Sequence, residues 1–211
     1  MRRYCEVIVF AILMLCVTLV QAQERFQSKA ATAEQLAAIQ SGGYVLFIRH
    51  GPTDSSLPDH VPVDLNDCST QRPLTDSGRA LMRQVGEDFH RARIPYEVVY
   101  SSPLCRAMET AGLIFGEDGY QVDANLLYVA ALTSDEKQPV IARTLELLTA
   151  PVPAHTNRVL VAHGPNLVEV MEYFPVEGTL VIIEPHVDGQ GFTYVASIEP
   201  HQWSLLSGEW E

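Results

Sequence analysis

The sequence predicts an α/β fold, a three-layer sandwich in which helices cover both faces of a mainly parallel sheet. Three short apolar runs, at residues 44–48, 97–100 and 158–162, have the β-branched and aromatic composition of buried strands. Segments of helical character alternate with these runs, an order typical of parallel sheets. Polar residues follow each run directly, and open parallel sheets bind ligands at the carboxyl ends of their strands.

Helices are expected between the strands. Residues 75–93 contain apolar residues at four-residue spacing from Leu81 to Phe89, with Thr75 as the N-cap. Another helix is expected to open with Ser102 as its N-cap and with a proline in its first turn. The remaining expected helices are residues 32–40, residues 140–148 and a short helix that ends at residue 173.

The last part of the chain predicts a change in strand direction. Residues 180–183 and 192–198 flank a glycine-rich turn and are expected to form an antiparallel edge of the sheet. Two long irregular excursions, residues 52–73 and 116–137, interrupt the alternation of strands and helices. Loops of this length within a compact domain are often functional.

The N-terminus predicts a secretory signal peptide over residues 1–22. A basic start and an apolar stretch over residues 7–20 precede a small residue, Ala22, at the cleavage position. An uncleaved anchor is disfavoured because this stretch is shorter than the ~20 residues that span a bilayer. We therefore expect one domain over residues 23–211, periplasmic or secreted, without a stable membrane anchor after signal cleavage.

Charge and cysteine content restrict the partners. The net charge of −12 argues against binding to nucleic acid. Cys68 and Cys105 remain after signal cleavage, and an exported pair is equally compatible with a disulfide and with two free thiols. The sequence contains no paired-cysteine or His-Glu-x-x-His metal spacing, so neither a metal nor another cofactor is expected.

Arginine and histidine gather after the predicted strands. Arg49 and His50 follow the first run, Arg106 lies shortly after the second, and His163 follows the third. Arginine forks match phosphate oxygens in pairs, and a neutral imidazole is a competent nucleophile. The arrangement predicts phosphoryl transfer through a phosphohistidine. The other histidines stand alone in polar surroundings and are expected at the surface: His60, His90, His155, His186 and His201.

Four stretches resemble, in order, the histidine phosphatase superfamily, which includes the cofactor-dependent phosphoglycerate mutases. They are residues 42–53, 71–79, 101–111 and 161–166. The resemblance implies a phosphoglycerate mutase-like fold, with His50 as the phosphorylated nucleophile. It also implies that Arg49, Arg106 and His163 line the phosphate pocket, and Thr53 matches a hydroxyl position near the phosphate.

The chain departs from the family pattern at the general acid. Many members carry a glutamate shortly after the second arginine, where this sequence has Tyr128. An alkoxide leaving group still needs a proton. We expect Glu177 to supply it, because Gly178 suggests a tight turn that could aim the carboxyl inward. A solvated turn acid is the plainer reading of Glu177, and Asp135 and Glu136 remain alternatives.

These features predict an exported phosphatase that hydrolyses a phosphate monoester or phosphohistidine through a phosphohistidine on His50. Its partner would be a small phosphorylated substrate. The chain resembles the subgroup with periplasmic lipopolysaccharide-sugar phosphatases and phosphohistidine phosphatases more than the mutases. A mutase-like phosphotransferase and a non-catalytic phosphate-binding module are the alternatives, and a metal-dependent hydrolase is a further rival. The sequence contains no signal for the oligomeric state.

Overall fold

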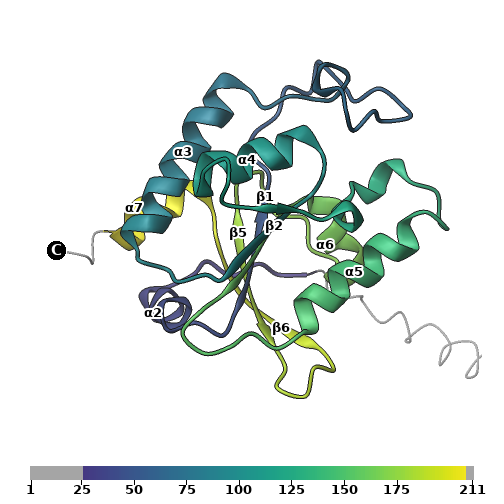
Figure 1. The fold of residues 1–211 in the computed structure, drawn as a ribbon. Coiled ribbons are helices and arrows are strands. Elements are labelled where there is room, and N and C mark those ends of the chain that lie inside the picture. Colours follow the sequence, from purple (N-terminus) through teal and green to yellow (C-terminus); the bar gives the residue numbers. More distant parts are fainter. Residues whose placement is uncertain (1–25, 208–211) are drawn as a thin grey trace, which may run out of the picture.

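The chain folds into three layers in the computed structural model, which describes residues 26–207 (Figure 1). Four helices cover one face of the sheet: α2 (Ala33–Ser41), α3 (Asp76–Arg91), α4 (Cys105–Phe115) and α7 (Trp203–Ser207). Two helices cover the other face: α5 (Lys137–Thr149) and α6 (Gly164–Met171). The predicted three-layer sandwich is confirmed, while the predicted signal peptide, residues 1–22, lies outside the described residues.

The described residues form one six-stranded sheet with the order β3-β2-β4-β1-β5-β6. Its strands are β1 (Val45–Arg49), β2 (Val98–Ser101), β3 (Gln121–Val122), β4 (Arg158–Ala162), β5 (Leu180–Pro185) and β6 (Phe192–Ile198). Strands β1, β4, β2 and β3 pair in parallel, whereas β5 is antiparallel to both β1 and β6. The predicted parallel sheet with an antiparallel edge is therefore confirmed.

Strand β1 contributes to both hydrophobic layers. Leu46 and Ile48 pack toward α3 and α4, whereas Val45 and Phe47 pack toward α5 and α6. All four side chains are fully buried. A strand covered on both faces needs an uninterrupted apolar sequence, which is why the sequence identified this strand so clearly.

The start of α3 approaches the loop that follows β1. The Thr75 hydroxyl accepts a hydrogen bond of 2.9 Å from the Gly78 N–H, so Thr75 is the N-cap that the sequence predicted. A Cβ atom at Gly78 would lie only 2.3 Å from the Pro52 carbonyl oxygen. The sequence predicted Leu81 as a core residue of α3. In the structure the next residue, Met82, is buried in the core, and Leu81 is only half-buried.

Helix α4 begins later than the sequence predicted. Its N-cap is Leu104, and the helix runs from Cys105 to Phe115. The expected N-cap, Ser102, instead places its hydroxyl 2.7 Å from Nε2 of His163. The Ser102 hydroxyl therefore makes a tertiary contact with His163 and is not the cap of α4 that the local sequence predicted. Strand β3 and helix α7 were not predicted.

The excursion over residues 52–73 is fastened to α4. Cys68 and Cys105 form a disulfide. Of the two alternatives that the sequence left open, a disulfide and two free thiols, the structure therefore contains the disulfide. The Cys105 N–H also donates a hydrogen bond of 2.8 Å to Oε1 of Gln71. The excursion is therefore held against the helix that carries Arg106. Within residues 26–207, no helix combines the length and the apolar character needed to cross a bilayer.

Candidate active site

The carboxyl ends of three strands bring the predicted residues together. Arg49 ends β1 and His50 follows it, while His163 directly follows β4. In the sheet register, Ile48 and Ser101 lie on either side of Val161, so the ends of β1, β2 and β4 are level. The rings of His50 and His163 lie 5.3 Å apart between centroids. Both histidines are almost completely buried.

The ring of His50 has a defined orientation. Its Nδ1 lies 2.9 Å from the carbonyl oxygen of Gly51. A carbonyl can only accept, so in the neutral imidazole the proton belongs on Nδ1. The lone pair is then on Nε2, as a nucleophile requires. The Gly51 backbone is itself held by the Thr110 hydroxyl, which accepts the Gly51 N–H at 3.0 Å.

Burial lowers the pKa of His50 to about 3. Desolvation of the charged form is the largest cause, and the positive charges of Arg106, Arg49 and Arg72 lower the pKa further. The Gly51 carbonyl opposes this shift because it favours the protonated ring. His50 is therefore neutral over the whole physiological range of pH.

His163 is held from one side only. Its Nε2 lies 2.7 Å from the Ser102 hydroxyl, whereas its Nδ1 is buried and has no hydrogen-bond partner within the described residues. Burial is the largest cause that lowers its pKa well below the usual value, followed by the neighbouring His50. A buried polar atom without a partner is costly and suggests a site for a ligand atom. An N–H at Nδ1 would suit a phosphoryl oxygen.

Arg106 is a fully buried cation with spare donors. One of its terminal nitrogens donates a hydrogen bond of 2.8 Å to Oδ1 of Asp59. Its Nε and its other terminal nitrogen are buried and lack partners among residues 26–207. The guanidinium also lies over the ring of Tyr128, at 5.2 Å. These unpaired donors, in the forked geometry of arginine, match the oxygens of a phosphoryl group.

Arg49 is anchored by the segment before β5. Its guanidinium donates a hydrogen bond of 2.5 Å to the Pro175 carbonyl and lies 4.4 Å from the centre of the Phe174 ring. A second terminal nitrogen is 3.4 Å from Oε1 of Glu177. Its buried Nε has no partner in the described part of the chain. Arg49 therefore also retains a donor for a ligand.

Arg72 is a site residue that the sequence analysis did not single out. Its charge lowers the pKa of both His50 and His163, and its buried Nε has no partner within the described range. The Arg72 N–H donates a hydrogen bond of 2.8 Å to Oδ1 of Asp59, the same oxygen that accepts from Arg106. The signal was available, because Arg72 lies in one of the four family-like stretches.

Glu177 and Thr53 meet at the other side of His50. The Thr53 hydroxyl donates a hydrogen bond of 2.8 Å to Oε1 of Glu177, which lies 4.0 Å from Nδ1 of His50. The turn that carries Glu177 is fixed by Gly178, which has a φ of +82°. The Gly178 N–H points to the carbonyl oxygens of Arg49 and His50, at 3.1 and 3.0 Å. Glu177 therefore lies at the site rather than in a solvated turn.

The other candidate acids lie elsewhere. Asp135 is exposed, and the carboxylate of Glu136 accepts hydrogen bonds from the N–H and the hydroxyl of Thr133. Tyr128, at the position of the missing glutamate, packs its ring edge-on against His163 at 5.4 Å between centroids.

The five remaining histidines are all exposed, as predicted.

The buried histidines make stability sensitive to acid. The pKa of His50 is about 3 in the fold and about 6.5 in the unfolded chain, so the unfolded state binds more protons between these values. The free energy of unfolding is therefore highest above pH 6.5 and falls as the pH drops toward 3. We expect His50→Asn to reduce this fall by about 1.4 kcal/mol per pH unit.

Urea unfolding of the wild type and of His50→Asn at pH 7 and pH 5 measures this difference. His155→Asn is the control, because His155 is exposed and its φ of +70° suits asparagine. Equal pH dependence in the wild type and in His50→Asn would show that His50 titrates normally in the fold.

Comparison with known proteins gives matches over part of the chain. The family model of the histidine phosphatase superfamily (branch 1) matches residues 45–126. Over 77 residues, 36% of this chain, the sequence is 31% identical to the serine/threonine-protein phosphatase Pgam5, mitochondrial, of Drosophila grimshawi. That match covers 24% of the length of the curated relative, so the chain corresponds to only part of it.

The fold has counterparts among solved structures. The protein histidine phosphatase SixA complexed with tungstate matches with a TM-score of 0.51 and 19% sequence identity. The match covers 75% of this chain and 98% of the SixA chain. At this identity the likeness concerns the fold. The comparisons therefore show a match to the histidine phosphatase superfamily model over part of the chain and a fold shared with SixA.

Proposed function

We propose that this protein is an exported phosphatase that hydrolyses a phosphate monoester or a phosphohistidine through a covalent phosphohistidine on His50. One observation carries the proposal: a neutral imidazole with a free Nε2 lies among arginines whose buried N–H groups have no partner in the described residues. A module that only binds phosphate needs the arginines but not an oriented nucleophile.

The reaction takes place in two in-line steps. In the first, Nε2 of His50 forms a bond to phosphorus while the ester P–O bond breaks, and the leaving oxygen takes the proton of the Glu177 carboxyl, which enters this step in its neutral form. In the second, water attacks phosphorus, Glu177 accepts a proton from this water, and the P–N bond breaks to release inorganic phosphate. The Gly51 carbonyl accepts the Nδ1–H of His50 throughout and stabilises the positive charge on the phosphorylated ring.

The arginines stabilise the transferred group. Arg49, Arg106 and Arg72 each have a buried N–H without a partner among residues 26–207. These N–H groups can donate hydrogen bonds to the phosphoryl oxygens and stabilise their negative charge. His163 adds the N–H of its unpartnered Nδ1. In this assignment the Thr53 hydroxyl donates a hydrogen bond to Glu177 and orients its carboxyl group.

The names of the matched proteins indicate two kinds of phosphorylated target, phosphohistidine for SixA and phosphoserine or phosphothreonine in proteins for Pgam5. Both are phosphoryl groups that a histidine nucleophile can accept. The most informative experiment is therefore a screen of the purified mature protein against sugar phosphates, phosphoamino acids, nucleotides and phosphohistidine. Hydrolysis without added metal, and unchanged by a chelator, is expected; a complete loss with chelator would favour a metal-dependent hydrolase.

Glu177→Gln tests the assignment of the general acid. We expect a loss of about 10²- to 10⁴-fold in kcat on alkyl phosphates, because their leaving oxygen must be protonated. The loss on p-nitrophenyl phosphate should be much smaller, because nitrophenolate leaves without a proton. Steady-state kinetics on both substrates measure the difference, with Glu184→Gln, at the one exposed residue of β5, as the control. Equal losses on both substrates would assign Glu177 a structural role.

Export is proposed from the character of residues 1–22 alone. N-terminal sequencing of the protein recovered from the periplasmic or extracellular fraction should begin at residue 23. A cytoplasmic protein that retains residue 1 would contradict export but would leave the phosphatase chemistry untouched.

A further inference from the structure

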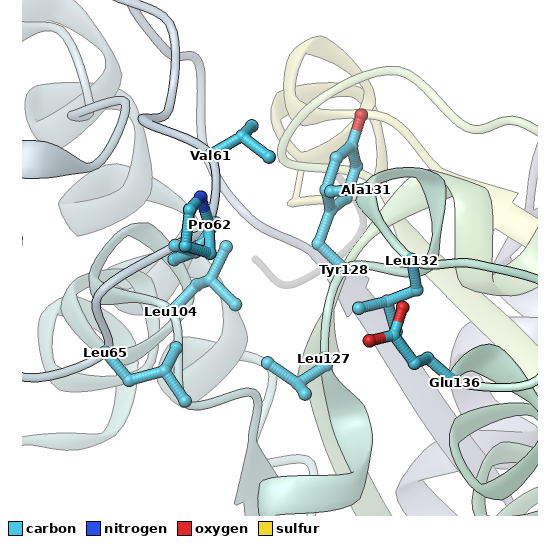
Figure 2. A pocket seen from close by; sticks show the side chains of 10 residues that line it. Val61, Pro62, Leu65, Leu104, Leu127, Tyr128, Ala131, Leu132 and Glu136 are labelled. Carbon is cyan, nitrogen blue, oxygen red and sulfur yellow. The ribbon is translucent and has the colours of Figure 1, made fainter.

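An apolar pocket of about 330 Å³ lies beside the phosphate site (Figure 2). One wall comes from the excursion over residues 52–73 together with Leu104, and the facing wall comes from residues 127–136 (Figure 2). The lining residues are Val61, Pro62, Val63, Leu65, Leu104, Leu127, Tyr128, Ala131, Leu132 and Glu136. A pocket of this size falls within the usual range for small-molecule sites.

The pocket adjoins the proposed reaction centre through Tyr128. This ring lines the pocket, lies 5.2 Å from the Arg106 guanidinium and packs against His163. Leu104, on the other wall, precedes Arg106 by two residues and is the N-cap of α4. A phosphoryl group held by Arg106 would therefore lie close to the mouth of the pocket.

The wall formed by the excursion is fixed in place. Asp59 receives hydrogen bonds from Arg106 and from the backbone of Arg72, and the disulfide holds Cys68 to the first residue of α4. These links lie on either side of Val61, Pro62 and Leu65 along the chain. Even so, Val61 is 78% exposed and Leu65 is 38% exposed. Exposed apolar side chains that are held in position beside a polar site suggest an apolar ligand.

The polar groups of the lining exclude some leaving groups. The only charged group among the lining residues is the carboxylate of Glu136, and no basic residue is among them. Hydrogen bonds from Thr133 are the main cause that lowers the pKa of Glu136, so it is anionic at neutral pH. An acidic leaving group would be repelled, and a sugar would find few partners for its hydroxyls.

We propose that this pocket binds the leaving group, and that the preferred substrates are phosphate esters of uncharged apolar alcohols. The inference rests on the proposed phosphatase function and specifies its substrate class. The phosphoryl group would lie among the arginines while the alkyl portion fills the space between Leu65 and Leu132. Glycerol, sugar and carboxylate-bearing phosphates would be poor substrates.

Chain length provides the direct test. In the series from methyl to hexyl phosphate, the reacting bond changes little while the buried apolar surface grows. Each methylene that enters the pocket should raise kcat/KM by about fourfold, so three buried methylenes give roughly 50-fold. Hexyl phosphate should also exceed glycerol 3-phosphate, glucose 6-phosphate and 3-phosphoglycerate. A flat series, or better hydrolysis of the polar esters, would overturn the pocket assignment.

Variants connect the series to this pocket. Leu132→Asn and Leu65→Asn place an amide in the two facing walls, and Ala131→Trp fills the space; each should lower the ratio of hexyl to methyl hydrolysis. Val187→Asn is the control, because Val187 is 97% exposed in the turn after β5. Strand β5 runs antiparallel to β1, so this turn lies at the opposite end of the sheet from the site. An unchanged ratio in all three pocket variants would contradict the inference.

Alkylphosphonates separate this inference from the proposed function, because their C–P bond is not hydrolysed. Calorimetry should show hexylphosphonate binding roughly 50-fold more tightly than methylphosphonate to the wild type, and this advantage should be lost in Leu132→Asn. If this pattern holds but no ester is hydrolysed, the pocket binds the alkyl group as proposed and the phosphatase proposal fails. If esters are hydrolysed but the two phosphonates bind equally, the pocket proposal fails.

Discussion

Replacement of His50 by alanine should abolish turnover while leaving the fold intact. The Gly51 carbonyl takes Nδ1 of the buried His50 ring, which leaves Nε2 as the nitrogen that can attack phosphorus. Removal of the nucleophile in other covalent hydrolases costs on the order of 10⁶-fold in rate. We therefore expect His50→Ala to lose activity by about 10⁶-fold on any substrate of the wild type.

The covalent intermediate gives an independent readout. Wild type quenched during turnover of a labelled phosphate ester should carry an acid-labile phosphoryl group, and His50→Ala should carry none. His186→Ala is a matched control, because His186 is exposed in the turn between β5 and β6 and should retain both activity and label. Full activity in His50→Ala would disprove the mechanism. A label that persists in an inactive His50→Ala would place the phosphoryl group elsewhere.

The parts of the fold that sequence predicted best are those with the strongest burial. Strand β4 has the same bounds in the prediction and in the structure, and β1 differs by one residue at each end. Both are covered on their two faces, so their sequence is apolar throughout. Strand β3 was missed for the opposite reason. Its two residues, Gln121 and Val122, are exposed at the edge of the sheet and carry no such signal.

The candidate site residues that could be predicted are those that directly follow a strand. Arg49, His50 and His163 directly follow buried strands, so sequence alone was enough to place them. Arg72 could not be placed in this way, because it lies in an irregular excursion. Its position depends on Asp59, which receives both the Arg72 N–H and the guanidinium of Arg106. Contacts between segments that are distant in sequence leave no local pattern.

The start of α4 shows how a functional contact overrides a local rule. Serine followed by proline is a common helix start, and the sequence therefore predicted Ser102 as the N-cap. The structure uses the Ser102 hydroxyl to hold His163 instead, and the N-cap lies two residues later, at Leu104. The deviation lies where the proposed chemistry requires an imidazole in a fixed position. Such conflicts between local preference and structure are expected at functional sites.

Arg106→Lys should be nearly as damaging as the complete loss of the side chain. Lysine preserves the positive charge but not the fork, and the fork is what allows Arg106 to bind Asp59 with one nitrogen while two others remain free. Removal of one donor that stabilises transition-state charge typically costs about 10²- to 10³-fold in rate. We expect a loss of this size in kcat/KM for Arg106→Lys.

Inhibition by vanadate separates loss of the phosphate site from loss of the fold. Vanadate should bind Arg106→Lys and Arg106→Ala much more weakly than the wild type, while circular dichroism and urea unfolding report whether each variant is folded. The control is Arg143→Lys. Arg143 also pairs with a carboxylate, Asp123, and lies 5.7 Å from the ring of Tyr100, but it belongs to α5 and is not among the residues of the candidate site. If a folded Arg106→Ala binds vanadate as tightly as the wild type, Arg106 does not contact the phosphoryl group, and its role is limited to the hydrogen bond with Asp59.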